Sequence, residues 1–405
     1  MPTFSYEALD SRGRVVSGSV EAPDAQSVVR DLRNSRYTVT NIREKKDSLR
    51  ALRMLSQRFE RVSLYALAIF TRQFAVLFNS GISTVRGLEG LGRQSLNARL
   101  TRAIQAVYDD IRGGYSLAKA MARHPDVFSP VYISMVKAGE MSGAMGEILD
   151  RLATFLEREL TLQKKVAAAT TYPAVVFVAC VTVTFILVTY VFPTFIDLFE
   201  GIDVRLPWIT RSLIWITSTI RNPLVMLPIL AAIGAGIYSV LQYFKTPWGR
   251  RQRDRLLLDL PVLGVLMKKV ALSRFCRTLG TLLGSGVPMV HALEIVSKAA
   301  GNDVISDVIE EVQMGLKAGM RLSQPLKEYR LFPPMLAQMV AIGEETGNLP
   351  LMLNKLADFY DLEVEHSLEA LTAMLEPVMI LFMGIAVGYV LLAVFIPVYD
   401  LVGQF

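Results

Sequence analysis

Two Gly-Glu-x-x-Gly motifs are the most distinctive polar features of this 405-residue sequence. Their glycines suit a helix end followed by a turn, because glycine adopts the left-handed conformation without strain. Ser142 and Thr346 are predicted to cap the helices that follow. The glutamates either hydrogen-bond backbone groups of the turn or line an interaction surface, and the sequence leaves both alternatives open. The motifs are Gly139, Glu140 and Gly143, and Gly343, Glu344 and Gly347.

Enzymatic chemistry has little support in the remaining residues. A phosphate-binding GxxxxGK[ST] loop is absent, because no glycine is followed by lysine, so an NTPase is not expected. His124, His291 and His366 share no metal-ligand spacing, and Cys180 and Cys276 lie far apart. We therefore expect no catalytic, cofactor or metal residues.

The composition indicates a membrane protein. Hydrophobic residues make up 52% of the chain, and the mean hydropathy is +0.37. Three charge-free stretches are each long enough to cross a bilayer, which takes about 20 residues. The predicted membrane helices are 173–192, 222–244 and 377–397.

Charges beside these stretches predict the topology. Lys164 and Lys165 precede the first span, and nine lysines and arginines follow the second. The positive-inside rule then puts the N-terminus in the cytoplasm and the C-terminus in the periplasm or outside. The first thirty or so residues carry charges and no continuous apolar core, so no signal peptide is expected. The net charge of +6 is explained by the basic residues beside the spans, which set the topology, rather than by nucleic-acid binding.

The chain repeats itself at an offset of about 205 residues. Thr71-Arg72-Gln73 corresponds to Cys276-Arg277-Thr278. Pro173 and Pro193, which bracket the first span, correspond to Pro377 and Pro397, which bracket the third. The middle span has no counterpart and returns the chain, so that both repeats lie on the cytoplasmic side.

The fold class predicted from these patterns is mainly α and polytopic, with a small α+β module at the N-terminus. Alternating residues predict strands at Thr3–Leu9, Val15–Val20 and Tyr37–Ile42, and Asp24 is predicted to cap a helix. Apolar residues at three- and four-residue steps predict bundles of about six helices in each repeat. The predicted segments are the α+β module 1–45, a basic helical linker 46–66, helical bundle 67–172, membrane helix 173–192, periplasmic loop 193–221, membrane helix 222–244, basic cytoplasmic linker 245–271, helical bundle 272–376, membrane helix 377–397 and periplasmic tail 398–405.

These features together resemble the type II secretion F / type IV pilus PilC family of inner-membrane assembly-platform proteins. The resemblance rests on Phe4-x-Tyr6-x-Ala8-x-Asp10-x-x-Gly13, the run from Thr71 to Gly81, both Gly-Glu-x-x-Gly turns, Tyr172-Pro173 and Glu376-Pro377. It implies a bacterial inner-membrane scaffold without enzymatic activity. Such a scaffold links a hexameric cytoplasmic ATPase to pilin or pseudopilin subunits.

The resemblance also implies further partners: other inner-membrane platform proteins, the lipid bilayer and a second copy of the chain in a dimer. Some family members hold calcium in the first bundle, at positions that read Leu96, Asp150 and Thr154 here. One carboxylate is too few for calcium, which takes about six to eight oxygen ligands, so no calcium is predicted. The alternative function is a membrane transporter or channel component. It is disfavoured because the three predicted spans carry no ionisable residue.

Overall fold

The computed structural model describes residues 3–9, 15–21, 24–34, 37–44, 62–94, 97–199 and 207–402. Two compact units divide the chain. The first contains Met1–Val62 with Leu96–Thr101, and the second contains Ser63–Ser95 with Arg102–Phe405. Ser11-Arg12-Gly13 predicts a turn between the first two predicted strands. This turn and most of the predicted basic linker 46–66 lie outside the described residues.

The N-terminal unit holds a three-stranded antiparallel sheet of β1 (Thr3–Leu9), β2 (Val15–Glu21) and β3 (Thr38–Glu44), in the order β2-β1-β3. Helix α1 (Ala25–Asn34) lies between β2 and β3 in sequence. Asp24 accepts the Ser27 amide at 2.7 Å, which satisfies a free N–H at the start of α1. The strands and the helix cap predicted from the sequence are confirmed.

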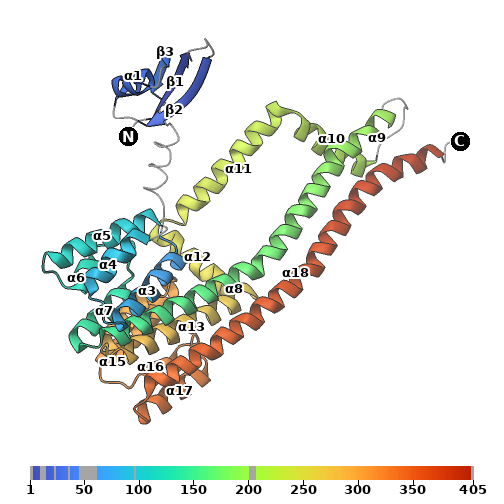
Figure 1. Ribbon diagram of the computed structural model, residues 1–405. Coiled ribbons are helices and arrows are strands. Elements are labelled where there is room, and N and C mark those ends of the chain that lie inside the picture. Colours follow the sequence, from blue (N-terminus) through green and yellow to red (C-terminus); the bar gives the residue numbers. More distant parts are fainter. Residues whose placement is uncertain are drawn as a thin grey trace. The chain divides into compact units, whose positions relative to one another are not determined.

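The second unit is helical, and each repeat contributes six helices among the described residues. Every helix of one repeat has a counterpart in the other (Figure 1). The helices of the first repeat are α3 (Leu64–Asn79), α4 (Thr84–Gln94), α5 (Ala98–Arg112), α6 (Leu117–Ala122), α7 (Pro130–Ser142) and α8 (Met145–Ile186). Those of the second repeat are α13 (Leu263–Gly284), α14 (Met289–Ala299), α15 (Asp303–Lys317), α16 (Ser323–Glu328), α17 (Pro334–Glu345) and α18 (Leu349–Val402).

Local signals explain where these helices begin and end. The sequence Ser129-Pro130 predicts an N-cap followed by a first-turn proline, and this prediction is confirmed: Ser129 accepts the Tyr132 amide at 3.3 Å and Pro130 occupies the first turn of α7. Left-handed glycines recur at matching turns of the two repeats, because only glycine adopts this conformation without strain. The pairs are Gly81 and Gly286 (φ 82° and 83°), Gly114 and Gly319 (91° and 90°), and Gly143 and Gly347 (both 71°).

The first and third membrane spans are not separate helices. The first is the continuation of α8, and the third is the continuation of α18, so each bundle runs into the membrane without a break (Figure 1). Pro173, Pro377 and Pro397, which bracket the charge-free stretches in the sequence, lie inside these helices. Membrane helices tolerate proline, because neighbouring helices and side chains satisfy the freed carbonyl groups.

The predicted loop 193–221 is largely helical where it is described. A π-helical turn, η1 (Leu187–Val191), is followed by α9 (Phe192–Phe199) and then by α10 (Trp208–Arg221). The wider turn precedes Pro193, whose ring would crowd the carbonyl group four residues earlier. Helix α10 packs against α18, where Thr210 donates a hydrogen bond to the Ala393 carbonyl at 2.8 Å.

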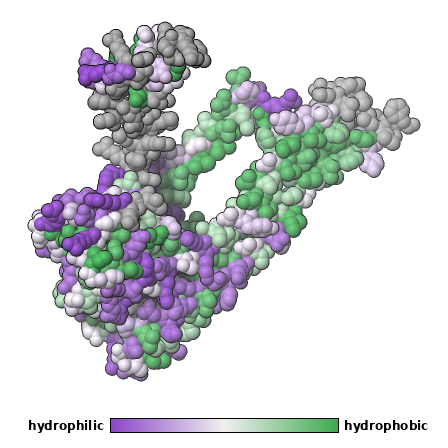
Figure 2. Space-filling view, in the orientation of Figure 1, coloured by the Kyte–Doolittle hydropathy of each residue, from purple (hydrophilic) through white to green (hydrophobic). Residues whose placement is uncertain are grey.

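The second span is α11 (Pro223–Tyr243), within the predicted range 222–244. The predicted basic linker 245–271 is also helical: it contains α12 (Pro247–Asp259) and the start of α13. Figure 2 shows hydrophobic side chains covering the spans and hydrophilic side chains covering the bundles. The predicted fold class is thereby confirmed, with three helices apolar and long enough to span a membrane in the described chain.

Candidate functional site

The glutamate of the first Gly-Glu-x-x-Gly motif caps a helix in its own repeat. Glu140 lies in α7 and accepts the amides of Leu117 at 2.5 Å and Ala118 at 3.2 Å. These amides begin α6, where a carboxylate also interacts favourably with the helix dipole. Ser116 binds the next free amide, that of Lys119, at 3.3 Å. The start of α6 is therefore held from two directions.

Glu344 repeats this arrangement in the second bundle. Its carboxylate accepts the Leu322 amide at 2.6 Å and the Ser323 amide at 3.2 Å. It also accepts the Ser323 hydroxyl at 2.6 Å, a contact with no counterpart at Ala118. These bonds correspond to the first of the two alternatives, in which the glutamates hydrogen-bond backbone groups. A role in an interaction surface stays a prediction.

The two glycines of each motif have different roles. Gly143 and Gly347 have the left-handed conformation that suits a turn. Gly139 and Gly343 lie within α7 and α17, where they bring two helices into close contact. A Cβ atom on Gly139 would lie 3.2 Å from the Ile148 side chain, and one on Gly343 would lie 3.0 Å from the Leu349 backbone.

The predicted caps at Ser142 and Thr346 are wrong. Helix α8 has Ala144 at its N-cap with no side-chain hydrogen bond; Ser142 accepts the Ala144 amide at 3.3 Å. Thr346 ends α17, and its hydroxyl donates back to the Ile342 carbonyl at 2.8 Å. The Thr346 hydroxyl thus serves the helix that is ending, whereas the Ser142 hydroxyl binds an amide of the turn.

An arginine at the same place in each repeat joins the first helix of the bundle to the long last helix. In the first repeat Arg72 binds Glu157 at 2.7 Å, Thr154 at 3.1 Å and Asp150. The hydrogen bond from Arg72 lowers the pKa of Glu157 below its ordinary value of 4.5, against the effect of partial burial. Asp150 and Thr154, the positions examined for calcium, are thus engaged by a guanidinium.

Arg277 is the counterpart in the second repeat. It lies on α13 and contacts Asp361 at 2.7 Å and Asp358 at 2.8 Å, both on α18. Its side chain is only 7% exposed, compared with 33% for Arg72. Ser273 donates a second hydrogen bond to Asp361.

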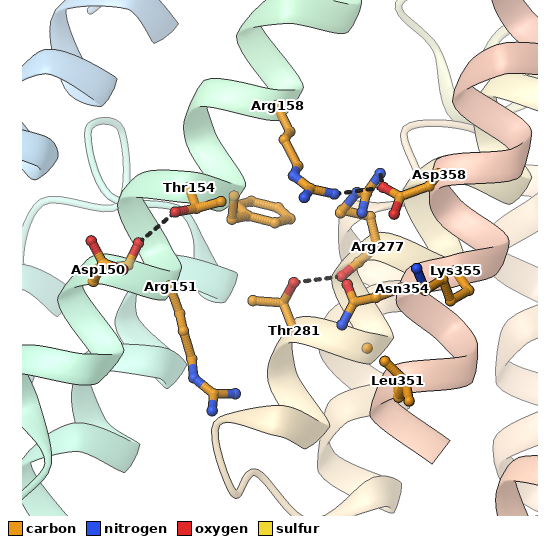
Figure 3. A pocket seen from close by; sticks show the side chains of 12 residues that line it. Asp150, Arg151, Thr154, Arg158, Arg277, Thr281, Leu351, Asn354, Lys355 and Asp358 are labelled. Carbon is orange, nitrogen blue, oxygen red and sulfur yellow. Dashed lines mark hydrogen bonds and ion pairs between the residues drawn. The ribbon is translucent and has the colours of Figure 1, made fainter. Parts of the chain in front are cut away.

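Further ion pairs connect one repeat to the other. Arg158 on α8 reaches Asp358 on α18 at 2.6 Å, as Figure 3 shows. Lys165 binds Glu365 at 2.6 Å, and Arg274 binds Glu159 at 2.7 Å. Within each bundle the core is apolar, whereas this contact between the repeats is rich in ion pairs. Buried core residues include Phe74, Leu149 and Leu152 in the first bundle and Leu279, Leu282 and Leu353 in the second.

A cavity of about 300 Å³ lies among α8, α13 and α18 at this contact (Figure 3). Arg151 borders it and donates to the Gly284 carbonyl at the end of α13, at 2.6 Å. Lys355 and Asn354 border it from α18. We call the ion pairs and the cavity together the inter-repeat contact. Ion pairs between charged side chains of the two bundles stabilise this contact.

Nothing in the described part of the chain gathers three or more His, Cys, Asp or Glu side chains into a potential metal site. His291 contacts Glu294 at 3.4 Å. Cys180 and Cys276 are buried, free thiols, and burial raises the pKa of the Cys276 thiol.

The clusters of acidic residues around Arg72 and Arg277 were not predicted from the sequence. A signal was present, because Arg72 and Arg277 occupy the same position of the repeat. Their partners lie more than 75 residues away, so the sequence alone did not identify them.

Comparisons with known proteins agree with this architecture. Residues 70–193 and 275–397 match the family described as "Type II secretion system (T2SS), protein F", and residues 1–43 match its "N-terminal domain". The type IV pilus assembly protein PilC of Thermus thermophilus is 40% identical over 404 residues, covering 100% of this chain and 99% of the relative. PilC of Myxococcus xanthus is 34% identical (99% and 95% covered), and the type II secretion system protein F of Xanthomonas campestris is 33% identical (99% and 99%).

Proposed function

Because this chain belongs to the type II secretion system protein F family, we propose that it is the assembly platform of a type IV pilus or type II secretion machine. In this role it couples a hexameric cytoplasmic ATPase to the insertion of pilin or pseudopilin subunits into a filament. The relatives' names include both kinds of machine, with 40% identity to a pilus assembly protein and 33% to a secretion protein.

The proposed setting is the bacterial inner membrane, with three spans, a cytoplasmic N-terminus and a C-terminus on the opposite side. Support comes from the lysines and arginines at the ends of the spans. Arg250 and Arg251, which follow α11, pair with Asp303 and Asp307 of α15. The basic segment is thus attached to the second bundle, which is expected on the cytoplasmic side.

The observation that carries the mechanism is the continuity of α8 and α18 from bundle to span. A continuous helix passes a displacement or rotation of the bundle directly to its membrane segment. The ATPase would move the bundles, and the spans would lift subunits out of the bilayer. In this proposal the chain has no catalytic activity and takes its energy from the ATPase.

A flexible insertion tests this mechanism. Four residues, Gly-Ser-Gly-Ser, are placed between Val166 and Ala167 in α8, and the same four between Gly113 and Gly114 as the control. Because Gly113 and Gly114 form an exposed turn, we expect the control to assemble filaments. The α8 insertion should still reach the membrane and co-purify with the ATPase, but filament number should fall at least tenfold.

Normal filament assembly with the α8 insertion would exclude transmission through this helix. If deletion of the gene left filaments unchanged, or if the ATPase never co-purified, the platform role itself would be lost. We also propose that the platform acts as a homodimer alongside other inner-membrane platform proteins.

A further inference from the structure

We propose that α11 of one copy of this protein docks in a groove between α8 and α18 of a second copy. This inference rests on the proposed oligomeric platform and identifies the surfaces that would join its copies. It starts from two unpartnered surfaces, an apolar groove that ends in carboxylates and an apolar helix that ends in a cation.

The groove lies along the parallel α8 and α18, close to where both leave the bundles. Its membrane part is an apolar cavity of about 410 Å³, bordered by Pro173, Phe177 and Cys180 on α8 and by Val378, Met379 and Phe382 on α18. The rings of Phe177 and Phe382 lie 6.3 Å apart and fix the two helices at the same level.

A second cavity of about 500 Å³ follows at the bundle side of this groove. The Lys165–Glu365 ion pair borders it, and so do Glu369 and Glu376, neither of which makes an ion pair with another described residue. Glu376 directly precedes Pro377, where the charge-free stretch of the third span begins. We call these two carboxylates the acidic mouth of the groove.

The acidic mouth does not suit lipid as its neighbour. Cytoplasmic ends of membrane helices normally carry lysine or arginine, and anionic headgroups repel carboxylates. At the corresponding position of the first repeat, Lys165 stands in place of Glu369, and it is already paired with Glu365. A cation at the level where the third span begins would therefore be a favourable partner for the carboxylates of the acidic mouth.

Helix α11 supplies such a cation. No residue of α11 is buried, and large side chains are exposed on all its faces, among them Leu227, Leu230, Ile233 and Ile237. Lys245 follows its cytoplasmic end, is exposed and makes no ion pair among the described residues. Helix α11 thus carries the cation that the acidic carboxylates lack and an apolar surface that can fill the apolar groove.

The apolar surface of α11 and the apolar part of the groove also lie at similar distances along their helix axes from the charges that would pair. Ser239 stands about 9 Å from Lys245 along α11, at 1.5 Å per residue. Val378 to Phe382 stand about 3 to 9 Å beyond Glu376 on the same scale. With Lys245 at the acidic mouth, the stretch around Ser239 therefore lies beside the apolar part of the groove.

A second copy is the occupant that these surfaces favour, since each copy carries both halves of the contact. Exchange of two α11 helices gives a closed twofold dimer, in which the same contact forms twice. Association within a bilayer depends on close packing rather than on hydrophobic burial. Gly234 and Gly236 permit such packing, because no atom in the described part of the chain lies within 4 Å of a Cβ placed there.

Disulfide crosslinking in native membranes tests the proposal. All variants carry Cys180→Ala and Cys276→Ala. One tagged full-length chain carries Ala174→Cys in the groove, and a second, differently tagged chain carries one cysteine at each position from 235 to 241 in turn. We expect crosslinked heterodimers at every third or fourth position of this scan. Val175→Cys, 62% exposed and not bordering the groove, replaces Ala174→Cys as the control and should give at least fivefold less product.

Each other outcome overturns the proposal in a recognisable way. Equal yields from Ala174→Cys and Val175→Cys would indicate random collision. A disulfide that forms only when both cysteines lie on one chain would identify the chain's own α11 as the occupant. Absence of crosslinks from a chain that still sediments as a dimer would overturn this interface alone. Absence from a monomeric chain would overturn the proposed dimer as well.

A charge exchange provides an independent readout. Lys245→Glu should lower the heterodimer yield about threefold, the effect of an exposed ion pair. Glu376→Lys in the groove-bearing chain should restore that yield. Lys268→Glu makes the same charge change elsewhere in the basic segment and should leave the yield unchanged. Failure of Glu376→Lys to restore the yield would contradict the pairing of Lys245 with the acidic mouth.

Discussion

Arg158 of α8 and Asp358 of α18 lie 2.6 Å apart, although 200 residues separate them in the sequence. Asp358 also contacts Arg277 of its own repeat at 2.8 Å. One carboxylate therefore serves an ion pair within the second bundle and another between the bundles. Any movement of one repeat against the other changes the surroundings of this carboxylate.

We expect Asp358→Asn to destabilise the protein more than Arg158→Gln does. Arg158 and Asp358 are each about half exposed, so the loss of their pair should cost about 0.5 kcal/mol. Removal of the Asp358 charge also weakens the contact with buried Arg277, for a total of about 1–2 kcal/mol. Thermal unfolding in detergent measures both. Equal midpoints would show that Arg277 depends on Asp361 alone. Glu89→Gln, in an exposed pair within α4, is the control.

Replacement of the capping glutamates should destabilise both bundles. Glu344→Ala leaves two amides and one hydroxyl without their acceptor, and the expected cost is about 2 kcal/mol. Glu140→Ala removes the acceptor of two amides and should cost less. The neighbouring Glu345→Ala is the matched control, because this side chain is exposed. A larger effect of Glu345→Ala on the unfolding midpoint would contradict the capping role.

Glycine-to-alanine changes should separate close packing from open surface. Gly343→Ala places a Cβ 3.0 Å from the Leu349 backbone, which cannot move aside as a side chain does, and should cost about 1–3 kcal/mol. Gly384→Ala meets no atom within 4 Å and should be neutral or slightly stabilising. Unfolding midpoints of the two variants provide the comparison, and similar values would refute this account of Gly343.

The Arg72–Glu157 pair predicts a pH dependence. The pKa of Glu157 is lowered in the folded state, so its contribution to stability is present above the ordinary value of 4.5. It is lost as pH falls below that value and the carboxylate binds a proton. We expect the unfolding midpoint to fall less between pH 6 and pH 3 in Glu157→Gln than in the unmodified chain. An identical fall in both would assign the acid sensitivity to other groups.

Local patterns were sufficient for much of the fold. The alternation of Thr3–Leu9, the caps at Asp24 and Ser129 and the charge-free stretches each depend on neighbouring residues, and all are found in the structure. The prolines at the ends of the charge-free stretches do not show by themselves whether a helix continues, because their cost in a helix depends on what surrounds the freed carbonyl groups. Only the packed structure shows that α8 and α18 continue through them.

The inter-repeat contact could not be predicted in the same way. Lys165 and Glu365 each have many oppositely charged residues available in the sequence, and their pairing depends on the parallel course of α8 and α18. The repeat identified equivalent positions, but equivalent residues need not touch. Arg277 has become the more buried of the two arginines, and the sequence contains no sign of that difference.

The unbroken course of α8 also fixes an angle between the bundle and the membrane. An α-helix turns by about 100° per residue, so one residue inserted between Arg158 and Pro173 would rotate the whole span by that angle. The side chains that now face α18 within the membrane would then face elsewhere. An insertion of seven residues would restore the direction to within about 20° and shift the span only along its axis. The number of residues in this helix therefore determines which side of the span faces α18, as well as how far the span lies from the bundle.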